Sequence, residues 1–398
     1  MKGKYKIELA STDSCTGCAA CVSVCPTGSI SMKEDREGFL QPYIDTKTCI
    51  GCHKCEKTCP ILNPIEIPND FETQAYAAIN KDEDVRMRSS SGGMFHALAK
   101  WTIEQGGVVF GARFNDQWEV VHDYTETIEG IEPFMRSKYV QSRIGDTFKQ
   151  AKQFLDQGRQ VLFVGTPCQI GGLNAFLGNE YENLLSVDLI CHGVPSPKVW
   201  REYLQSISKG EIVVEVNMRD KEKGWKKYQQ LTTTTTTTTT RRELNSVNPY
   251  FAGFLGNIYL RRSCYDCQYK TIHRIADFTI ADYWGVDEIC PNMFDDKGTS
   301  IIFTHTLKAR NTLIQLRNVI FSPQTIGSAI KYNESMIKSV SIPIQRNIFY
   351  IFLNCFGFYS AKPFIYNTQP IIRFWGRTLR LTKRIMRNVK KITDRKID

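Results

Sequence analysis

The sequence contains no apolar run long enough to cross a membrane. Its longest such stretch, residues 348–359, is interrupted by Asn354 and is well short of the roughly 20 residues that a transmembrane helix needs. Residues 1–14 also lack the charged start and following apolar run of a secretory signal. The 14 cysteines are therefore not expected to form disulfides. We expect a soluble, cytoplasmic protein whose thiolates bind metal.

The sequence also has little net charge outside its last segment. Residues 371–398 hold ten Lys or Arg and two Asp, a net charge of +8, which leaves only +2 of the total of +10 for the rest of the chain. So small a surplus excludes an extended basic face for nucleic acid. An acidic partner, if there is one, is expected at the tail.

The tail places apolar residues on one helical stripe between basic faces. The members of the stripe are Ile372, Trp375, Leu379, Met386 and Val389. This pattern is typical of a helix that lies on an anionic membrane surface, so we expect a peripheral contact with the inner face of the membrane. The alternative is a solvated helix that packs its stripe on the protein.

The cysteines near the start of the chain form an internal repeat. Cys15, Cys18, Cys21, Cys25 and Pro26 recur 34 residues later as Cys49, Cys52, Cys55, Cys59 and Pro60. Both copies read C-x-x-C-x-x-C-x-x-x-C-P, the run of bacterial ferredoxins in which three cysteines hold one 4Fe-4S cluster and the fourth ligates the other. The repeat therefore predicts two clusters in one ferredoxin-like module.

This crossed pattern assigns the ligands. We expect one cluster on Cys15, Cys18, Cys21 and Cys59, and the other on Cys49, Cys52, Cys55 and Cys25. A pair of zinc sites would leave the third cysteine and the Cys-Pro of each copy unexplained. His53 lies within the second run, but four cysteines already satisfy each cluster, so it receives no role.

The central region alternates strand and helix patterns. Hydrophobic residues (42%) and charged residues (23%) are at ordinary globular levels, and 398 residues suffice for two or three compact units. Strands are predicted at residues 107–112, 160–165 and 184–190, and helices at residues 94–104 and 146–157. This order predicts a mixed α/β domain with a mixed or parallel sheet. Residues 232–240 are nine threonines, to which we assign no chemistry.

A serine- and glycine-rich segment precedes the first of these helices. Ser90, Ser91, Gly92 and Gly93 lie directly before residue 94, where free backbone amides make an anion site that suits a dinucleotide pyrophosphate. The alternative is an ordinary serine cap of the helix.

Four further cysteines lie apart in the sequence. Cys168 and Cys191 follow predicted buried strands, and Cys264 and Cys267 form a C-x-x-C pair. Strand ends meet at one edge of a sheet, so the pair could complete four thiolates around a third cluster. Two core cysteines plus a zinc or redox pair remain the alternative.

Several motifs together resemble the beta-subunit family of coenzyme F420 hydrogenases and dehydrogenases. They lie at residues 88–93, 137–142, 165–169, 191–193, 261–267 and 277–285, within a match that spans residues 76–286, or 10–290 with the ferredoxin module. Family members bind FAD beside a 4Fe-4S cluster, so the resemblance implies that Cys168, Cys191, Cys264 and Cys267 hold an inner cluster. It also implies FAD contacts from the serine segment, Lys138, Thr166, Asp282 and Trp284.

The resemblance further implies two catalytic residues, Lys138 and His192, beside the isoalloxazine ring, where a reduced flavin favours a positive or proton-donating neighbour.

Two positions depart from the family pattern. Arg262 stands where proline is usual, and Ala281 stands where glycine is usual. Neither removes a ligand, although the alanine could crowd a turn beside Asp282 and Trp284.

The predicted function is a flavin-dependent iron-sulfur oxidoreductase that exchanges electrons with a donor or acceptor such as ferredoxin or coenzyme F420. The alternatives are an electron-transfer subunit for a separate enzyme, a reductase of a small metabolite or sugar intermediate, and a metal-stabilised scaffold. The predicted domains are residues 1–66 (ferredoxin module), 72–145 and 146–330 (the two parts of the flavin domain), and 331–398 (a helical extension with the basic tail).

Overall fold

The computed structural model describes residues 6–67, 72–235, 240–244 and 247–366. The predicted apolar stripe of the basic tail and its membrane contact lie outside these residues. Among the described helices, none is both long enough and apolar enough to span a bilayer.

The strands form three sheets. They are β1 (Ile30–Glu34), β2 (Leu40–Ile44), β3 (Gln74–Asn80), β4 (Val108–Phe114), β5 (Val120–Thr125), β6 (Val161–Gly165), β7 (Leu184–Leu189), β8 (Val213–Asp220), β9 (Gln229–Thr234), β10 (Thr240–Leu244), β11 (Phe278–Asp282), β12 (Ser300–Thr304) and β13 (Val319–Gln324). The largest sheet has the order β13-β3-β12-β11-β7-β6-β4-β5, while β8, β9 and β10 form a second sheet and β1 pairs with β2. Within the large sheet, the parallel pairs are β4 with β6, β6 with β7, and β7 with β11.

The helices α4, α5, α6 and α10 cover the large sheet, and others lie in the ferredoxin module or beside the second sheet. The α-helices are α1 (Ala20–Ser23), α2 (Lys54–Lys57), α3 (Glu83–Arg88), α4 (Met94–Glu104), α5 (Thr147–Asp156), α6 (Pro167–Leu177), α7 (Pro197–Ser208), α8 (Pro249–Leu255), α9 (Val286–Ile289), α10 (Leu307–Gln315), α11 (Ile326–Ile330) and α12 (Arg346–Ala361). Short 3-10 turns are η1 (Glu129–Phe134), η2 (Arg262–Cys264), η3 (Pro291–Met293), η4 (Glu334–Met336) and η5 (Lys362–Phe364). The predicted strands correspond to β4, β6 and β7 and the predicted helices to α4 and α5, which confirms a mixed α/β fold.

Alternate residues of the parallel strands face two different layers. Val109 and Leu162 pack with side chains of α4 and α10, whereas Val108 and Val161 pack with side chains of α5 and α6. A strand points successive side chains to opposite faces, so near-continuous apolar strands are what a doubly covered sheet requires. The carboxyl ends of β6 and β7 therefore lie at one edge of a three-layered domain.

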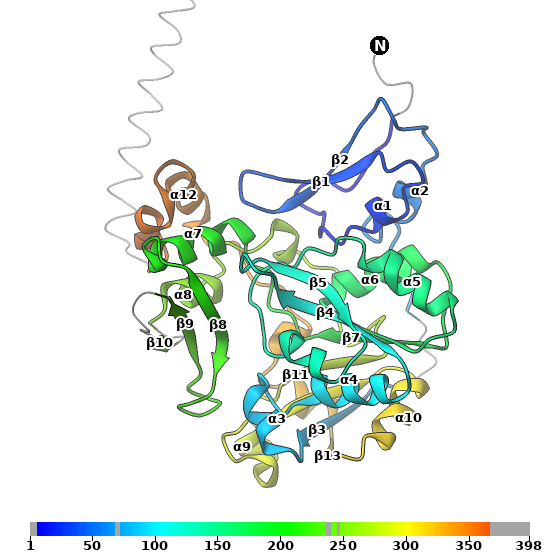
Figure 1. Ribbon diagram of the computed structural model, residues 1–398, viewed down its shortest axis with the longest axis vertical. Helices are drawn as coiled ribbons and strands as arrows, with labels where there is room; N and C mark the ends of the chain where they lie inside the picture. Colours follow the sequence, from blue (N-terminus) through cyan, green and yellow to red (C-terminus); the bar gives the residue numbers. More distant parts are fainter. Residues whose placement is uncertain (1–5, 68–71, 236–239, 245–246, 367–398) are drawn as a thin grey trace, which may run out of the picture.

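The ferredoxin module sits at this edge, above α5 and α6 (Figure 1). Cys18, Ala19 and Ala20 are buried in the same apolar cluster as side chains of α5 and α6. The turn between β1 and β2 reaches the other side of the molecule, where Glu37 accepts a hydrogen bond of 2.7 Å from Arg346 of α12. The module thus contacts the domain both through α1 and through the turn between β1 and β2.

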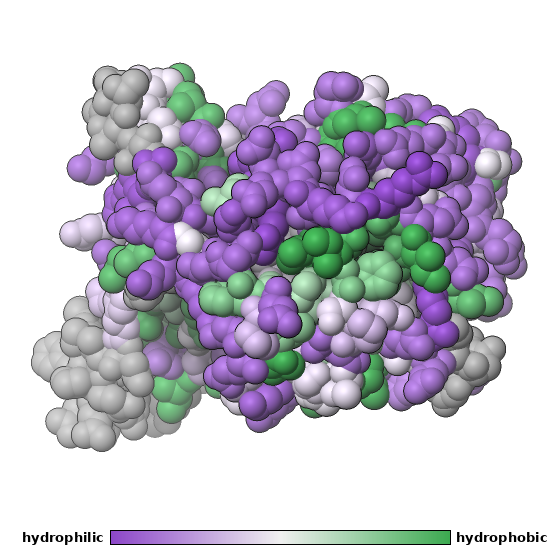
Figure 2. Space-filling model, turned by 90° about the horizontal axis from the view of Figure 1, so that it is seen from below, coloured by the Kyte–Doolittle hydropathy of each residue, from purple (hydrophilic) through white to green (hydrophobic). Residues whose placement is uncertain are grey.

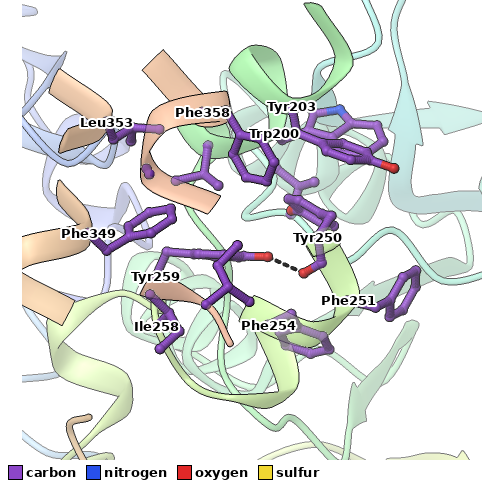
Figure 3. Packing of buried hydrophobic residues seen from close by; sticks show 14 of the residues in the cluster. Trp200, Tyr203, Tyr250, Phe251, Phe254, Ile258, Tyr259, Phe349, Leu353 and Phe358 are labelled. Carbon is purple, nitrogen blue, oxygen red and sulfur yellow. Dashed lines mark hydrogen bonds between the residues drawn. The ribbon is translucent and has the colours of Figure 1, made fainter. Parts of the chain in front are cut away.

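An aromatic cluster joins α7, α8 and α12 (Figure 3). Trp200 and Tyr203 of α7 pack with Tyr250 of α8, and the hydroxyl of Tyr259 donates a hydrogen bond to the carbonyl of Tyr250. Because Tyr259 and Leu260 are fully buried here, the chain enters the segment that follows, with its C-x-x-C pair, from a fixed position.

The threonine run lies partly in paired strands. Thr232 and Thr233 of β9 pair with β10, and residues 236–239 lie outside the described residues.

On the face shown in Figure 2, polar side chains predominate and apolar side chains form small patches. The edge strand β13 exposes Ile320 and Phe321.

Candidate functional site

Three cysteines of the first run and one of the second line a single cavity. The cavity measures about 370 Å³ and its wall includes Cys15, Cys18, Cys21 and Cys59. Burial, together with smaller effects of the neighbouring Cys15 and Cys59, raises the pKa of the Cys18 thiol to about 11. Thiols buried together in this way resist ionisation unless a metal centre compensates their charge. The structure brings together the first predicted ligand set.

Of the second predicted set, Cys25 and Cys55 lie near each other. Burial raises the pKa of Cys55, and Cys25 is one of its charged neighbours. Cys52 is exposed. Cys49 and Cys52 belong to the loop that leads into α2. This group therefore lies at the outer side of the module.

Glycine is required at the same place in both copies of the run. Gly17 and Gly51 have φ of 70° and 67°, a conformation that glycine adopts at little cost. A Cβ at Gly17 would also lie 2.7 Å from a guanidinium nitrogen of Arg261. His53, to which the sequence analysis assigned no role, pairs with Glu56 of α2 at the surface.

The four remaining predicted ligands line a second cavity of about 460 Å³. They are Cys168, Cys191, Cys264 and Cys267. Cys168 is the second residue of α6, directly after β6, and Cys191 follows β7, while the C-x-x-C pair comes from η2 and the loop beyond it. We call this space the inner cavity. The parallel pairing of β6 with β7 brings the first two cysteines to one sheet edge, as predicted.

The inner cavity combines thiols with cations. Burial raises the pKa of Cys168 well above its usual value, and the thiols of Cys267, Cys191 and Cys264 raise it further. Arg261, Lys270 and Arg274 also line the wall. Arg274 is 5% exposed, and its Nε and Nη1 make no hydrogen bond among the described residues, although Nη1 lies 3.6 Å from Asp188. These unsatisfied donors fit an anionic group with acceptor atoms, as a thiolate-bound cluster is.

Two kinds of thiolate site differ in how they use their ligands. A zinc site gathers its thiolates within about 2.3 Å of one centre, whereas a 4Fe-4S cluster distributes four thiolates over four irons. Across the part of the chain that the structure describes, no group of three or more cysteine, histidine or acidic side chains is placed to hold one metal ion.

The module and α6 meet through a glycine. A Cβ at Gly172 would lie 2.7 Å from the Cβ and 3.0 Å from the Sγ of Cys18. Real Cβ atoms do not approach other atoms so closely, and a crowded core loses about 1–3 kcal/mol. The absence of a side chain at this position therefore sets how closely the first ferredoxin cavity approaches the domain.

Gly172→Ala is expected to weaken this docking and to lower the midpoint of thermal unfolding, because the added methyl group displaces Cys18. Gly327→Ala is the matched control, since Gly327 is also helical but has no atom within 4 Å of its Cβ position. Alanine is favoured over glycine in a helix by about 1 kcal/mol, so the control should be neutral or stabilising. Equal midpoints for the two variants would contradict the close approach.

The serine segment packs on the sheet edge formed by β3 and β12. Ser91 donates to the carbonyl of Thr299 (2.7 Å), and the amide of Gly92 donates to Ser300 (3.0 Å). The cap of α4 is Gly93, with φ of 85° and no side-chain hydrogen bond. The alternative of a serine cap is therefore wrong, because the chain must turn through a left-handed conformation at this point.

Buried cations that the sequence analysis missed surround this segment. Arg219 of β8 donates to both carboxylate oxygens of Asp282 (3.0 and 2.9 Å) and to the carbonyl of Ser90 (2.9 Å). Lys221 donates to the carbonyls of Arg86 and Ser91, and burial lowers its pKa to about 7. Both residues belong to the charged run 218–227, which has the composition of a solvated surface.

Asp282 and Trp284, both predicted flavin contacts, lie in this cation group. Trp225 donates to Asp282 through its indole nitrogen (2.8 Å) and stacks on Trp284 with ring centroids 4.9 Å apart. Ala281 occupies the usual glycine position without a positive φ. The crowding expected from Ala281 does not occur, because this residue lies within the strand β11 and not in a turn.

The two predicted catalytic residues lie in different surroundings. His192 lines the inner cavity and its Nε2 is 2.6 Å from Oδ1 of Asn257. Lys138 donates to the carbonyl of Met135 (2.6 Å), and burial lowers its pKa to about 7. Among the described residues no hydrogen bond joins the two. The hydroxyl of Thr166, the cap of α6, lies 3.2 Å from the sulfur of Cys168.

Two segments of the chain match known family models. Residues 14–62 match the 4Fe-4S dicluster domain, and residues 158–320 match the C-terminal part of the coenzyme F420 hydrogenase/dehydrogenase beta subunit. The predicted resemblance is confirmed. Over these residues the chain is related to iron-sulfur electron-transfer proteins of the F420 hydrogenase beta-subunit type, and the dicluster match spans both cysteine runs.

Among solved structures, one similar chain belongs to the F420-reducing nickel-iron hydrogenase complex from Methanosarcina barkeri, studied by xenon derivatization. It is 14% identical, with a TM-score of 0.45, and the alignment covers 68% of this chain and 90% of that chain. No curated protein matches the sequence.

Proposed function

We propose that the protein is a flavin-dependent iron-sulfur oxidoreductase with three 4Fe-4S clusters. The observation that carries the proposal is the inner cavity, where four thiols from three distant segments share one space with three cations. Such convergence at the carboxyl edge of parallel strands is how α/β folds assemble sites. Bound clusters would supply one-electron transfer and a bound flavin would supply hydride transfer.

The residues of the inner cavity would hold a cluster and neutralise its charge. Cys168, Cys191, Cys264 and Cys267 would be the ligands. Lys270 already fixes the loop of Cys191, because its ammonium group donates to the carbonyl of that residue. Arg274 retains unsatisfied donors in the wall, and hydrogen bonds to cluster sulfurs tune the reduction potential.

The cation group around the serine segment would hold the flavin. Arg219, Lys221 and Lys138 bring three basic side chains to a region whose carboxylates are Asp282, Asp295 and Glu132, and Nε of Arg219 has no hydrogen bond within the described residues. The uncapped start of α4 adds free backbone amides. An unpaired guanidinium nitrogen beside a helix amino terminus supplies donors that suit the phosphates of FAD.

Metal and flavin analysis of the full chain, prepared without oxygen, tests this function. We expect a flavin absorbance band and about twelve irons per chain, since three clusters hold four irons each. Eight irons without flavin would instead indicate a pure electron carrier, and zinc without iron would indicate a scaffold. Coenzyme F420, a nicotinamide and reduced ferredoxin can then be compared as reductants of the bound flavin.

Lys138→Met is expected to make the flavin midpoint potential more negative, because it removes a cation that stabilises the anionic reduced ring. Since the pKa of Lys138 is about 7, the side chain is charged mainly below that pH. The difference from the unsubstituted protein should therefore grow as pH falls below 7 and shrink above it. Lys100→Met, on the half-exposed surface of α4, is the control, and a pH-independent difference would contradict this role.

A further inference from the structure

The inner cavity and the first ferredoxin cavity share a wall. Thr16 lines both of them. Tyr269 lines the inner cavity, and its ring lies against Gly171 of α6, where a Cβ would be 2.4 Å from the phenol oxygen. The next residue, Gly172, makes the same kind of close approach to Cys18 of the module. Two adjacent glycines thus bring the tyrosine and the module together on one turn of helix.

Tyr269 stands between thiols of the two cavities. Its phenol packs on Gly171 of α6, and the adjacent Gly172 packs on Cys18 of the module. Cys168 belongs to the same helix and lines the inner cavity. The adjacent Gln268 donates to the carbonyl of Pro60 (2.9 Å), which belongs to the wall of the first ferredoxin cavity. The C-x-x-C loop therefore contacts the module immediately beside the tyrosine.

The hydroxyl groups in this wall are unsatisfied. Tyr269 is 8% exposed and Thr16 is 7% exposed, and neither hydroxyl oxygen has a hydrogen bond of good geometry within the described residues. The side chain of Gln268 lies near the hydroxyl of Tyr269, and the thiol of Cys18 lies near that of Thr16. Leaving a buried hydroxyl unpaired costs about 1–3 kcal/mol, so such groups normally have a partner. The groups that face them from both sides are cysteine thiols, and sulfur atoms of bound clusters would be acceptors in the right place.

We propose that Tyr269 is a positioning residue that couples the inner cavity to the site of Cys15, Cys18, Cys21 and Cys59. This proposal rests on the proposed function. The tyrosine hydroxyl, with that of Thr16, donates hydrogen bonds to sulfur atoms across the shared wall. The first ferredoxin site is thereby the entry to the module, and the site that includes the exposed Cys52 is its outer end.

The physical effect follows from charge. Reduction adds one electron to a cluster and makes it more negative, so a hydrogen bond to its sulfur stabilises the reduced form and raises the potential. With clusters bound on both sides of the wall, a transfer would oxidise one cluster by one electron and reduce the other by one. The tyrosine donates a hydrogen bond throughout, and neither its proton nor an electron is lost.

The test is an anaerobic redox titration of the full chain, followed by electron paramagnetic resonance. Tyr269→Phe is expected to lower the midpoint potential of a cluster facing the wall while iron content and the outer cluster stay unchanged. Thr16→Val, which removes the second hydroxyl, is expected to shift the same signals in the same direction. Tyr203→Phe is the control, because it removes a buried hydroxyl that bonds Asn248 in the aromatic cluster.

The possible results of this titration distinguish a failure of this proposal from a failure of the proposed function on which it rests. Clusters with unchanged potentials in both Tyr269→Phe and Thr16→Val would overturn the role of the wall and leave the oxidoreductase function intact. A shift confined to the outer cluster, or an equal shift in Tyr203→Phe, would also overturn it. Protein without iron would instead overturn the function itself.

Discussion

Cys264→Ala should reduce the iron content from about twelve to about eight per chain, because one 4Fe-4S cluster loses a ligand. Its thiol is buried beside Cys191 and Cys267, and the loss of one thiolate exposes a cluster to release. The eight ferredoxin cysteines are untouched by the change. Iron analysis and the visible spectrum of anaerobically prepared protein measure the result.

Two cysteines outside the three groups provide controls. Cys355 is exposed on α12 and Cys290 is partly buried near β3 and α9. We expect Cys355→Ala and Cys290→Ala to retain all the iron. An unchanged iron content in Cys264→Ala would show that the inner cavity holds no cluster, and a drop to zero would show that the three sites assemble as one unit.

Arg261→Leu is the second large effect that we expect. Its guanidinium is 1% exposed and donates to the carbonyls of Cys15 (2.7 Å) and Leu40 (3.0 Å) and to the amide oxygen of Gln141 (3.0 Å). Removing it leaves buried acceptors of the module and of the domain unpaired, at about 1–3 kcal/mol for each group left unsatisfied. The ferredoxin module should then detach from the domain.

The neighbouring arginine offers a matched control. Arg262 is exposed and pairs with Glu37 and Asp13, and surface ion pairs contribute about 0–1 kcal/mol. Limited proteolysis of residues 6–67 and the rate of cluster loss in air should rise sharply in Arg261→Leu and little in Arg262→Ala. Similar behaviour of both variants would mean that the module is held mainly by the apolar contacts of α1.

The sequence predicted what depends on local pattern. The crossed ligands Cys15, Cys18, Cys21 and Cys59 follow from a repeat, and the edge position of Cys168 follows from strand order. Both required only spacing and the geometry of parallel strands.

The positions that escaped prediction depend on segments meeting in space. Arg219 and Lys221 lie in a charged run whose burial comes from the approach of β8 to the serine segment. Tyr269 and Thr16 are separated by about 250 residues, and their shared wall exists only because Gly171 and its neighbour lack side chains. No local pattern encodes such an approach.

The bond between Glu37 and Arg346 has a consequence for biosynthesis. The two residues are 309 positions apart, and a ribosome adds roughly 5–20 residues per second. The nascent ferredoxin module must therefore wait on the order of 15–60 seconds before its second anchor has been translated. Until then the module can be held only by segments that precede α12 in the chain.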